Sequence, residues 1–313
     1  MSPARPVFDC ITLETPNSLR PLMQEWREST PLQQRRIGLR NREQLSRFLY
    51  KYRGFGGDYA ERNLRDMIVH SVLRLSSPST FNDPYEMCVH VVVEGTQEQR
   101  LERFRQIAAE RTASLPAAQQ AAVVQRLMER PDAEHVKQCQ ASLTGIRQRA
   151  GVYCFAGDPR SVLMWSHYAE NHQGVCLQFE RLKDFLTLGH AVRVDYRHDL
   201  PVSNWIVGFY ESIRAILLAK HPSWQYEDER RITSIDNANR YLQLRPDALT
   251  GIIFGCRIQR DRMQFIDRLL AEREALGAPR VETYLATQHM TKYKVVISKR
   301  ARYQKDGRSK VWV

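Results

Sequence analysis

The sequence lacks long apolar runs: no uninterrupted stretch approaches the roughly 20 residues that a membrane-spanning helix needs. Its first residues, Met1 to Pro6, also lack the charged region and the apolar stretch of a signal peptide. Hydrophobic residues nevertheless make up 42% of the 313 residues, which is enough for a folded core. We therefore expect a cytoplasmic protein with no membrane partner.

The motifs of several common enzyme classes are missing as well. The chain has no Walker-type loop, no G-x-S-x-G elbow, no H-E-x-x-H motif and no zinc-ligand spacing. The stretch Gly54-Phe55-Gly56-Gly57 is too short to indicate a phosphate-binding loop. The 6 cysteines include no C-x-x-C pair, and Cys154, Cys176 and Cys256 lie in apolar strand-like runs. This pattern predicts small buried side chains, and neither a disulfide nor a metal site.

The charge is strongly positive, with a formal net charge of +12 and a pI of about 9.6. Such a balance favours a polyanionic partner such as nucleic acid. The basic residues are mostly arginines spread along the whole chain, however, and many stand at helical spacing from glutamates. A salt-bridged, solvated surface therefore explains the charge equally well, and the count alone does not decide between the two.

The order of expected elements is irregular and contains no βαβα alternation, so we predict an α+β fold. Its sheet is expected to be mixed or mostly antiparallel, with a split sheet as one form, and to carry packed helices. Residues 1–40 are expected to form an N-terminal extension, and residues 41–313 a single domain. Residues 96–149 are rich in Gln, Ala, Glu and Arg, and their apolar residues, such as Leu101, Phe104 and Ile107, recur at helical spacing, which predicts an inserted helical lobe.

Two clusters of polar and aromatic residues lie in the first third of the chain. Alternation along a strand at Tyr50-Lys51-Tyr52-Arg53 places the two tyrosines on one face and the two cations on the other. The alternative is an edge strand with packed tyrosines. The stretch from Ser76 to Glu86 predicts a rigid turn that holds Asn82 at a cleft. Its alternative is a helix cap, in which Asp83 caps and Glu86 completes a capping box.

A third cluster, Met164 to Gly174, combines Trp165, His167, Tyr168 and His172 directly before a buried strand. On a helix the two histidines would lie about 140° apart, because they are five residues apart. This geometry disfavours a metal site made by both histidines. We interpret the cluster as one wall of a binding site, and the alternative is hydrogen-bonded core histidines.

The fourth cluster is Trp224-Gln225-Tyr226-Glu227-Asp228-Glu229-Arg230-Arg231. If the chain is extended here, Glu227 and Glu229 point the same way. Two carboxylates placed together can bind a ribose diol or stabilise a developing cation. The alternative is an edge strand in which Glu229 pairs with an arginine.

Taken in order, these phrases resemble the motifs of a bacterial family called domain of unknown function 2971. The resemblance runs from about residue 49 to 300. Its most specific parts are Phe-Asn-Asp-Pro at residues 81–84 and Met-Trp-Ser-His-Tyr-Ala at 164–169. The phrases Leu49 to Tyr52, Tyr85-Glu86 and Trp224 to Arg230 also resemble family motifs. The sequence departs from the pattern at Phe155-Ala156, where Phe-Ser is expected. Membership implies kinship and no particular reaction.

A looser resemblance is to ADP-ribosyltransferases, which share the order of a basic or aromatic strand, a serine-rich strand and a late glutamate that opens a strand. This resemblance implies NAD as a substrate-cofactor, with Lys51 or Arg53 at the pyrophosphate and Tyr168 or Trp165 stacked on nicotinamide. It implies that Glu229 or Glu227 is catalytic. Together with the clusters above, it gives the expected catalytic residues Glu229, Glu227 and His167, and the expected cofactor-binding residues Lys51, Tyr52, Arg53, Ser76, Ser77, Asn82, Trp165, Tyr168 and His172.

Three functions therefore follow as hypotheses. The first is an ADP-ribosyltransferase-like enzyme, acting in defence or as a toxin on a nucleic acid or protein acceptor. The second is a metal-dependent nuclease, in which Asn82, Asp83, Glu86, Glu227 and Glu229 would ligate magnesium. The third is a non-catalytic module that senses a nucleotide or binds a partner.

Overall fold

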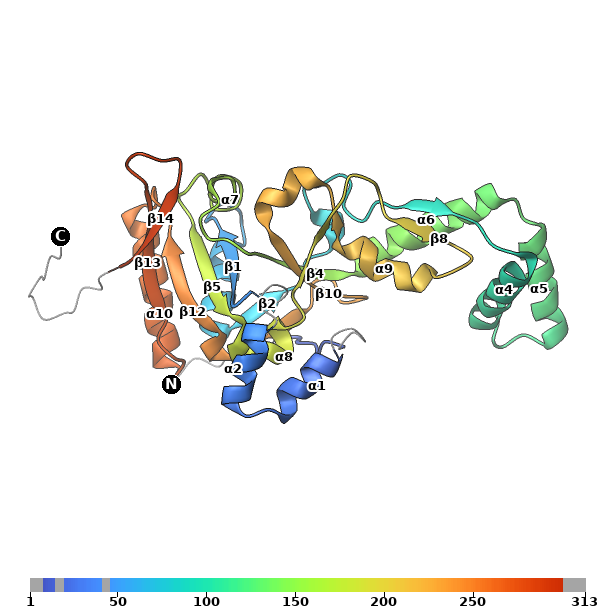
Figure 1. Cartoon of the computed structure of the whole chain (residues 1–313), viewed down its shortest axis with the longest axis horizontal. Coiled ribbons are helices and arrows are strands. Elements are labelled where there is room, and N and C mark those ends of the chain that lie inside the picture. Colours follow the sequence, from blue (N-terminus) through green and yellow to red (C-terminus); the bar gives the residue numbers. More distant parts are fainter. Residues whose placement is uncertain (1–7, 15–19, 41–45, 301–313) are drawn as a thin grey trace, which may run out of the picture.

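The computed structural model describes residues 8–14, 20–40 and 46–300, and its centre is an eight-stranded sheet (Figure 1). The strands follow the spatial order β14 (Val295–Lys299), β13 (Glu282–Gln288), β12 (Leu249–Phe254), β5 (Val175–Glu180), β1 (Phe48–Arg53), β4 (Gly151–Ala156), β10 (Glu229–Ser234) and β6 (Val192–Arg193). All neighbouring pairs are antiparallel except β12 and β13. The prediction of an α+β fold with a mixed, mostly antiparallel sheet is confirmed.

Three smaller sheets surround the large one. They pair β2 (Val72–Arg74) with β11 (Tyr241–Gln243), β3 (His90–Val92) with β8 (Val202–Asn204), and β7 (Asp195–Tyr196) with β9 (Ala219–Lys220). The last pair lies beside the start of β10, where the backbone amide of Glu229 donates to the Tyr196 hydroxyl at 2.9 Å, and this places Lys220 next to Glu229.

Alternation along the strands gives the large sheet two apolar faces. One face packs on α3 (Ala60–Arg65), on the π-helical turn Asp66–His70 and on α10 (Arg260–Ala275). The other packs on α7 (Val162–Tyr168), where Tyr50, Tyr52 and Cys176 meet Met164 and Trp165. The prediction that the two tyrosines share a face is therefore confirmed. Since β1 lies between β5 and β4, the edge-strand alternative is wrong.

The helical lobe predicted at residues 96–149 is present. It consists of α4 (Gln97–Arg111), α5 (Ala117–Glu129) and α6 (Asp132–Arg149), and it projects from one end of the sheet (Figure 1). A capping box between Thr96 and Gln99 starts α4. The lobe is joined to α9 (Phe209–Leu218) by one shared core that includes Phe104 and Phe209.

The N-terminal segment contains α1 (Arg20–Glu28) and α2 (Pro31–Arg40), which pack on α8 (Phe185–Leu188). Trp26 and Phe185 form the centre of this contact, with ring centroids 4.4 Å apart. Short 3-10 helices complete the described chain at Pro78–Thr80, Arg181–Asp184, Pro222–Glu227 and Pro246–Ala248. No helix within the described ranges is long and apolar enough to cross a bilayer.

The large sheet is split between β1 and β4. These two strands are paired at a single position, Tyr50 with Ala156, whereas β1 pairs with β5 along its whole length. The Lys51 ammonium lies in the gap that follows and donates to the Cys154 carbonyl at 2.6 Å. A gap in the middle of a sheet leaves main-chain groups of both strands open to side chains and ligands.

Trp165 tests the packing of α7 on the sheet. It is fully buried, donates its indole N–H to the Pro159 carbonyl at 2.8 Å, and meets the Tyr52 ring edge-on. We expect Trp165→Ala to lower the free energy of unfolding by about 3–5 kcal/mol, because it leaves a large cavity. The neighbouring Leu163→Ala should change it by less than about 1 kcal/mol, since Leu163 is 46% exposed. Urea denaturation measures both, and equal effects would contradict the packing described.

Candidate functional site

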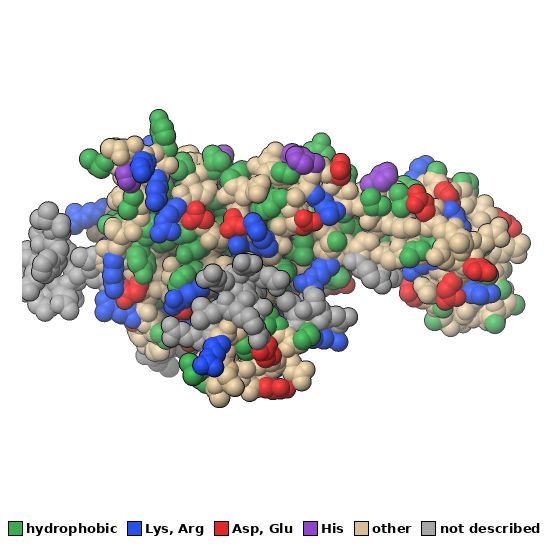
Figure 2. Space-filling view, in the orientation of Figure 1, with side chains coloured by type: hydrophobic (Ala, Val, Ile, Leu, Met, Phe, Trp, Pro, Cys, Tyr) green, Lys and Arg blue, Asp and Glu red, His purple; other side chains and the backbone are tan. Residues whose placement is uncertain are grey.

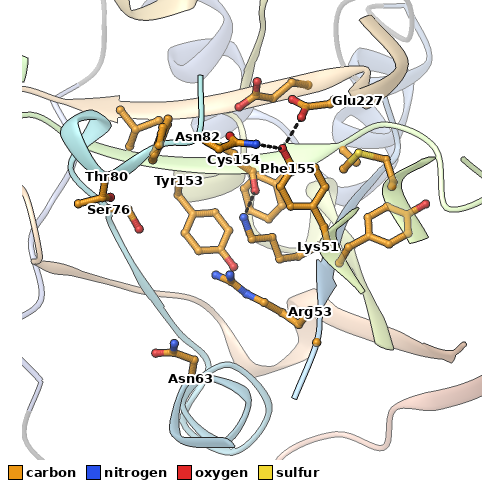
Figure 3. A pocket seen from close by; sticks show the side chains of 18 of the residues that line it. Lys51, Arg53, Asn63, Ser76, Thr80, Asn82, Tyr153, Cys154, Phe155 and Glu227 are labelled. Atoms are coloured by element: carbon orange, nitrogen blue, oxygen red, sulfur yellow. Dashed lines mark hydrogen bonds between the residues drawn. The ribbon is translucent and has the colours of Figure 1, made fainter. Parts of the chain in front are cut away.

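A pocket of about 630 Å³ opens where β1 and β4 separate, and we call it the central pocket. This volume lies in the range of small-molecule sites. Figure 3 shows Arg53 and Glu227 at opposite ends of the pocket with Lys51 between them. The pocket brings together eight of the expected site residues: Lys51, Tyr52, Arg53, Ser76, Asn82, Tyr168, Glu227 and Glu229.

The carboxylate end of the pocket is built around Lys220. Its ammonium lies 2.5 Å from one oxygen of Glu227 and 2.9 Å from one oxygen of Glu229, and all three side chains are buried. Burial opposes the charge of Lys220, but the two glutamates outweigh it and raise the lysine pKa above its ordinary value. The lysine therefore stays protonated and compensates the repulsion between the two carboxylates.

The two glutamates differ in their acidity. Burial favours the neutral form of both. For Glu229, the adjacent guanidinium of Arg231 and the ammonium of Lys220 outweigh burial, and its pKa falls well below the usual range. For Glu227, burial and the negative charge of Glu229 prevail over Lys220, and its pKa is raised. Glu227 is thus the weaker acid of the pair.

The local backbone that places the two glutamates differs from the expected extended strand. Glu227 ends the 3-10 helix Pro222–Glu227, and Asp228 adopts a left-handed conformation with φ 42° before β10 begins at Glu229. The expectation that strand alternation aligns the pair is therefore wrong, although the two carboxylates do converge. The left-handed residue turns the chain so that both reach Lys220.

Arg231 holds Glu229 in place through a buried ion pair. Its guanidinium is fully buried and bonds Glu229 at 2.9 Å and both oxygens of Glu86 at 2.6 and 2.9 Å. Glu86 is therefore the partner of Arg231, and the capping-box alternative for Glu86 is wrong. Asp83 instead accepts the Tyr85 amide at 2.9 Å within a turn. The alternative in which Glu229 pairs with an arginine is confirmed for the ion pair. Its expectation of an edge strand is wrong, because β10 lies between β4 and β6.

Tyr168 connects the carboxylate end to the mouth of the pocket. Its hydroxyl donates to Glu227 at 2.5 Å and accepts from the Asn82 amide at 3.5 Å (Figure 3). Burial and the charge of Glu227 raise the Tyr168 pKa, so the phenol keeps its proton and remains a donor. Tyr168 comes from α7 and Asn82 from the turn after Pro78–Thr80, so two distant segments meet at the Tyr168 hydroxyl, which in turn bonds Glu227.

The opposite end of the pocket is cationic. Lys51 lies over the Tyr153 ring, 4.6 Å from its centroid, and burial lowers its pKa to about 8. Arg53 lies beside the Tyr153 hydroxyl, and its Nε is buried without a hydrogen-bond partner in the described part of the chain. A buried guanidinium nitrogen with no acceptor marks a position where a ligand oxygen would be favourable.

The glycine loop after β1 holds an anion of the protein itself. The amides of Phe55 and Gly56 donate to the Glu170 carboxylate at 2.7 and 3.0 Å, and Arg262 pairs with it at 2.8 Å. Successive amides of this kind form an anion-binding nest. Here the nest anchors the turn after α7, in which residues 170–172 all have positive φ.

Four expected site residues lie outside the pocket lining. Ser77 is buried and donates its hydroxyl to the Arg147 carbonyl at 3.0 Å. Trp165 is core, and His172 stacks on it with centroids 6.2 Å apart. His167 is exposed and lies beside the Tyr226 ring. These side chains support the walls of the site or lie outside it, and none of them contacts the pocket space.

Several residues of the site carry no sequence signal of their own. Lys220 follows an apolar helix in sequence, and only its contacts with Glu227 and Glu229 in the folded chain reveal its role. Tyr153 and Cys154 read as ordinary members of a buried strand, yet both line the pocket. Cys176 is buried as predicted, while Cys154 and Cys256 are partly exposed, and all the cysteines are free.

The carboxylates do not form an evident metal centre. In the described ranges, no group of three or more His, Cys, Asp or Glu side chains is placed to hold a metal ion. The oxygens of Glu86, Glu227 and Glu229 are bonded to Arg231 and Lys220. A cation that bound here would have to displace one of these two side chains.

Comparison with known proteins gives one match. Residues 164–232, which include Tyr168, Lys220, Glu227 and Glu229, match the family described as "Protein of unknown function (DUF2971)". The matched segment covers the carboxylate end of the pocket and confirms the family resemblance there. No curated protein and no solved structure matches the chain.

The Glu86–Arg231 pair tests whether the ion network stabilises the site. We expect Glu86→Gln to lower the free energy of unfolding by about 3–5 kcal/mol, because it leaves the buried guanidinium short of negative charge. Glu180→Gln is the matched control, since its partner Arg47 is 67% exposed, and it should cost at most about 1 kcal/mol. Thermal or urea unfolding distinguishes them, and a neutral Glu86→Gln would contradict the assigned role of the pair.

Proposed function

We propose that this protein, part of which matches a family of unknown function, is an NAD-using enzyme of the ADP-ribosyltransferase type. It would transfer ADP-ribose to a nucleic acid or protein acceptor, in a defence or toxin setting. The family match covers the carboxylates of the proposed site, Glu227 and Glu229, and leaves the reaction open. The proposal therefore depends on the chemistry of the central pocket.

The observation that carries the proposal is the opposite charge of the two ends of one pocket. Arg53 lines one end, Glu227 and Glu229 line the other, and Lys51 lies between them. A nicotinamide dinucleotide has the same polarity, with an anionic pyrophosphate and a ribose that becomes cationic when its bond to nicotinamide breaks. Cations suit the first group and a carboxylate suits the second, and both effects are strong in a partly enclosed site.

The reaction needs little acid catalysis. The bond between ribose C1′ and the nicotinamide nitrogen breaks, the electron pair leaves with nicotinamide, and positive charge spreads over C1′ and the ring oxygen. A carboxylate beside C1′ lowers the free energy of this state. An acceptor oxygen or nitrogen then bonds to C1′ and gives up its proton, for which Glu227, with its raised pKa, is the suitable base.

The remaining residues have supporting roles in this proposal. Tyr168 is the stacking residue of choice for nicotinamide, because it lines the pocket whereas Trp165 is enclosed in the core. Its hydroxyl orients Glu227. Glu229 is a positioning residue, since Arg231 and Lys220 occupy its oxygens. The nuclease and the non-catalytic module stay hypotheses that no contact in the pocket specifically favours.

Nicotinamide release from NAD tests the proposal. Purified protein incubated with NAD, alone and with DNA, RNA or lysate, should release nicotinamide. Glu227→Gln should lower the rate by about a hundredfold, because the amide cannot stabilise the ribosyl cation or accept the proton. Chromatography of nicotinamide gives the rate directly.

The control is Glu129→Gln, a change of the same type on helix α5 of the lobe, which should leave the rate unchanged. If NAD neither binds nor is consumed under any of these conditions, the proposal is wrong. Cleavage of nucleic acid that needs magnesium and proceeds without NAD would support the nuclease instead.

The lowered pKa of Lys51 predicts that NAD binding depends on pH. Its pKa of about 8 means that the ammonium is present below pH 8 and is lost as the pH rises through that value. Because only the ammonium attracts a pyrophosphate, the affinity for NAD should fall as the pH is raised from 7 to 9. Lys51→Met should bind NAD more weakly at pH 7 and lose this dependence. Isothermal titration at several pH values measures it, and a pH-independent wild-type affinity would contradict it.

A further inference from the structure

The turn between β13 and β14 carries the most exposed large apolar side chains of the described chain. Met290 is 96% exposed and Tyr293 is 109% exposed. The turn itself is ordered by hydrogen bonds, since the His289 amide donates to the Lys294 carbonyl at 2.9 Å and the Thr291 amide to the His289 ring at 3.1 Å. A defined turn thus presents a ring that is fully exposed in the described part of the chain.

The charge of this turn is entirely positive. No acidic residue occurs from Leu285 to Arg300. Lys292 and Lys294 flank Tyr293, both are exposed, and neither makes an ion pair with any residue that the structure describes. Figure 2 shows apolar and basic side chains protruding together at this corner of the molecule. We call residues 289–294 the hairpin tip.

The hairpin tip lies on the same side of the sheet as α7. Ala286 and Val295, at its base, belong to the apolar face that contains Met164 and Trp165 of α7. In Figure 1 the β13–β14 loop and α7 rise from the same edge of the sheet. Since Tyr168 of α7 reaches Glu227, a chain held by the hairpin tip could run over α7 to the mouth of the central pocket.

From these features we infer that the hairpin tip binds single-stranded nucleic acid. Tyr293 would stack on a base, and Lys292 and Lys294 would contact the phosphates on either side. An exposed aromatic ring between cations is the combination that single strands require, because every base offers a stacking face and every nucleotide a negative charge. The net charge of +12 favours the same partner.

In this view the strand held by the hairpin tip is also the acceptor of ADP-ribose, and that one part of the inference rests on the proposed function. The binding itself needs neither NAD nor the carboxylates. The two ideas therefore fail separately, because strand binding is measured in the absence of NAD, whereas nicotinamide release is measured with NAD, both with and without nucleic acid.

Fluorescence anisotropy with labelled single strands of about 16 nucleotides, both DNA and RNA, tests the inference. Tyr293→Ala should weaken binding about tenfold through the lost stacking. The double change Lys292→Ala and Lys294→Ala should reduce the slope of log affinity against log salt by about 1.4, which is about 0.7 for each lost phosphate contact. Because these side chains are exposed, the variants should melt like the wild type.

Matched controls are Tyr85→Ala, which removes a ring that is 66% exposed elsewhere, and the double change Lys137→Ala and Lys183→Ala. Both should bind the oligonucleotides as the wild type does. The inference is overturned if the hairpin variants bind like the wild type or if the controls weaken binding equally. It is also overturned if the wild type binds vesicles of phosphatidylserine and phosphatidylcholine but no oligonucleotide, which would identify a membrane-binding tip.

Discussion

The buried ion network of Glu86, Arg231, Glu229, Lys220 and Glu227 is the constraint on which the rest of the site depends. Removing five ionisable groups from water is costly unless each finds an opposite charge and further hydrogen bonds. Here three carboxylates alternate with two cations, and the Leu217 carbonyl takes a further guanidinium N–H. The network joins the turn at residues 78–86, the end of β9 and the start of β10. It therefore fixes three distant segments around one end of the central pocket.

The split between β1 and β4 supplies the space that this network borders. Fully paired strands would close the sheet at Cys154, but pairing stops at Tyr50 and Lys51 fills part of the gap. The cations of β1 reach the gap from the face of the sheet that packs on α3 and α10, and the carboxylates reach it from the face that packs on α7. A pocket with one positive and one negative end follows from strand alternation combined with a local failure of strand pairing. That charge separation is the physical basis for proposing a dinucleotide as the ligand.

Much of the fold follows from local sequence pattern, while the contacts of the site do not. Alternation at Tyr50–Arg53 and the helical spacing at residues 96–149 depend on neighbours in sequence, so β1 and the lobe could be predicted. Polar aromatics beside a buried strand are unusual and therefore indicate a site, and eight of the expected residues line one pocket. The pairing of Glu86 with Arg231 joins residues 145 positions apart, and Lys220 meets its two glutamates only because the chain turns through a left-handed residue at Asp228. No periodicity of the sequence encodes such contacts, which is why the spacing of Asp83 and Glu86 fits a capping box as well as it fits the observed Glu86–Arg231 pair.

The most direct test of the central claim is hydrogen–deuterium exchange of the whole protein with and without NAD. If the central pocket binds the dinucleotide, NAD should slow the exchange of amides in residues 50–57, 152–156 and 222–229, which line or border its two ends. Lobe helices α4 and α5 should exchange at the same rate in both samples. Protection confined to the lobe, or no protection anywhere at saturating NAD, would contradict the assignment of this pocket.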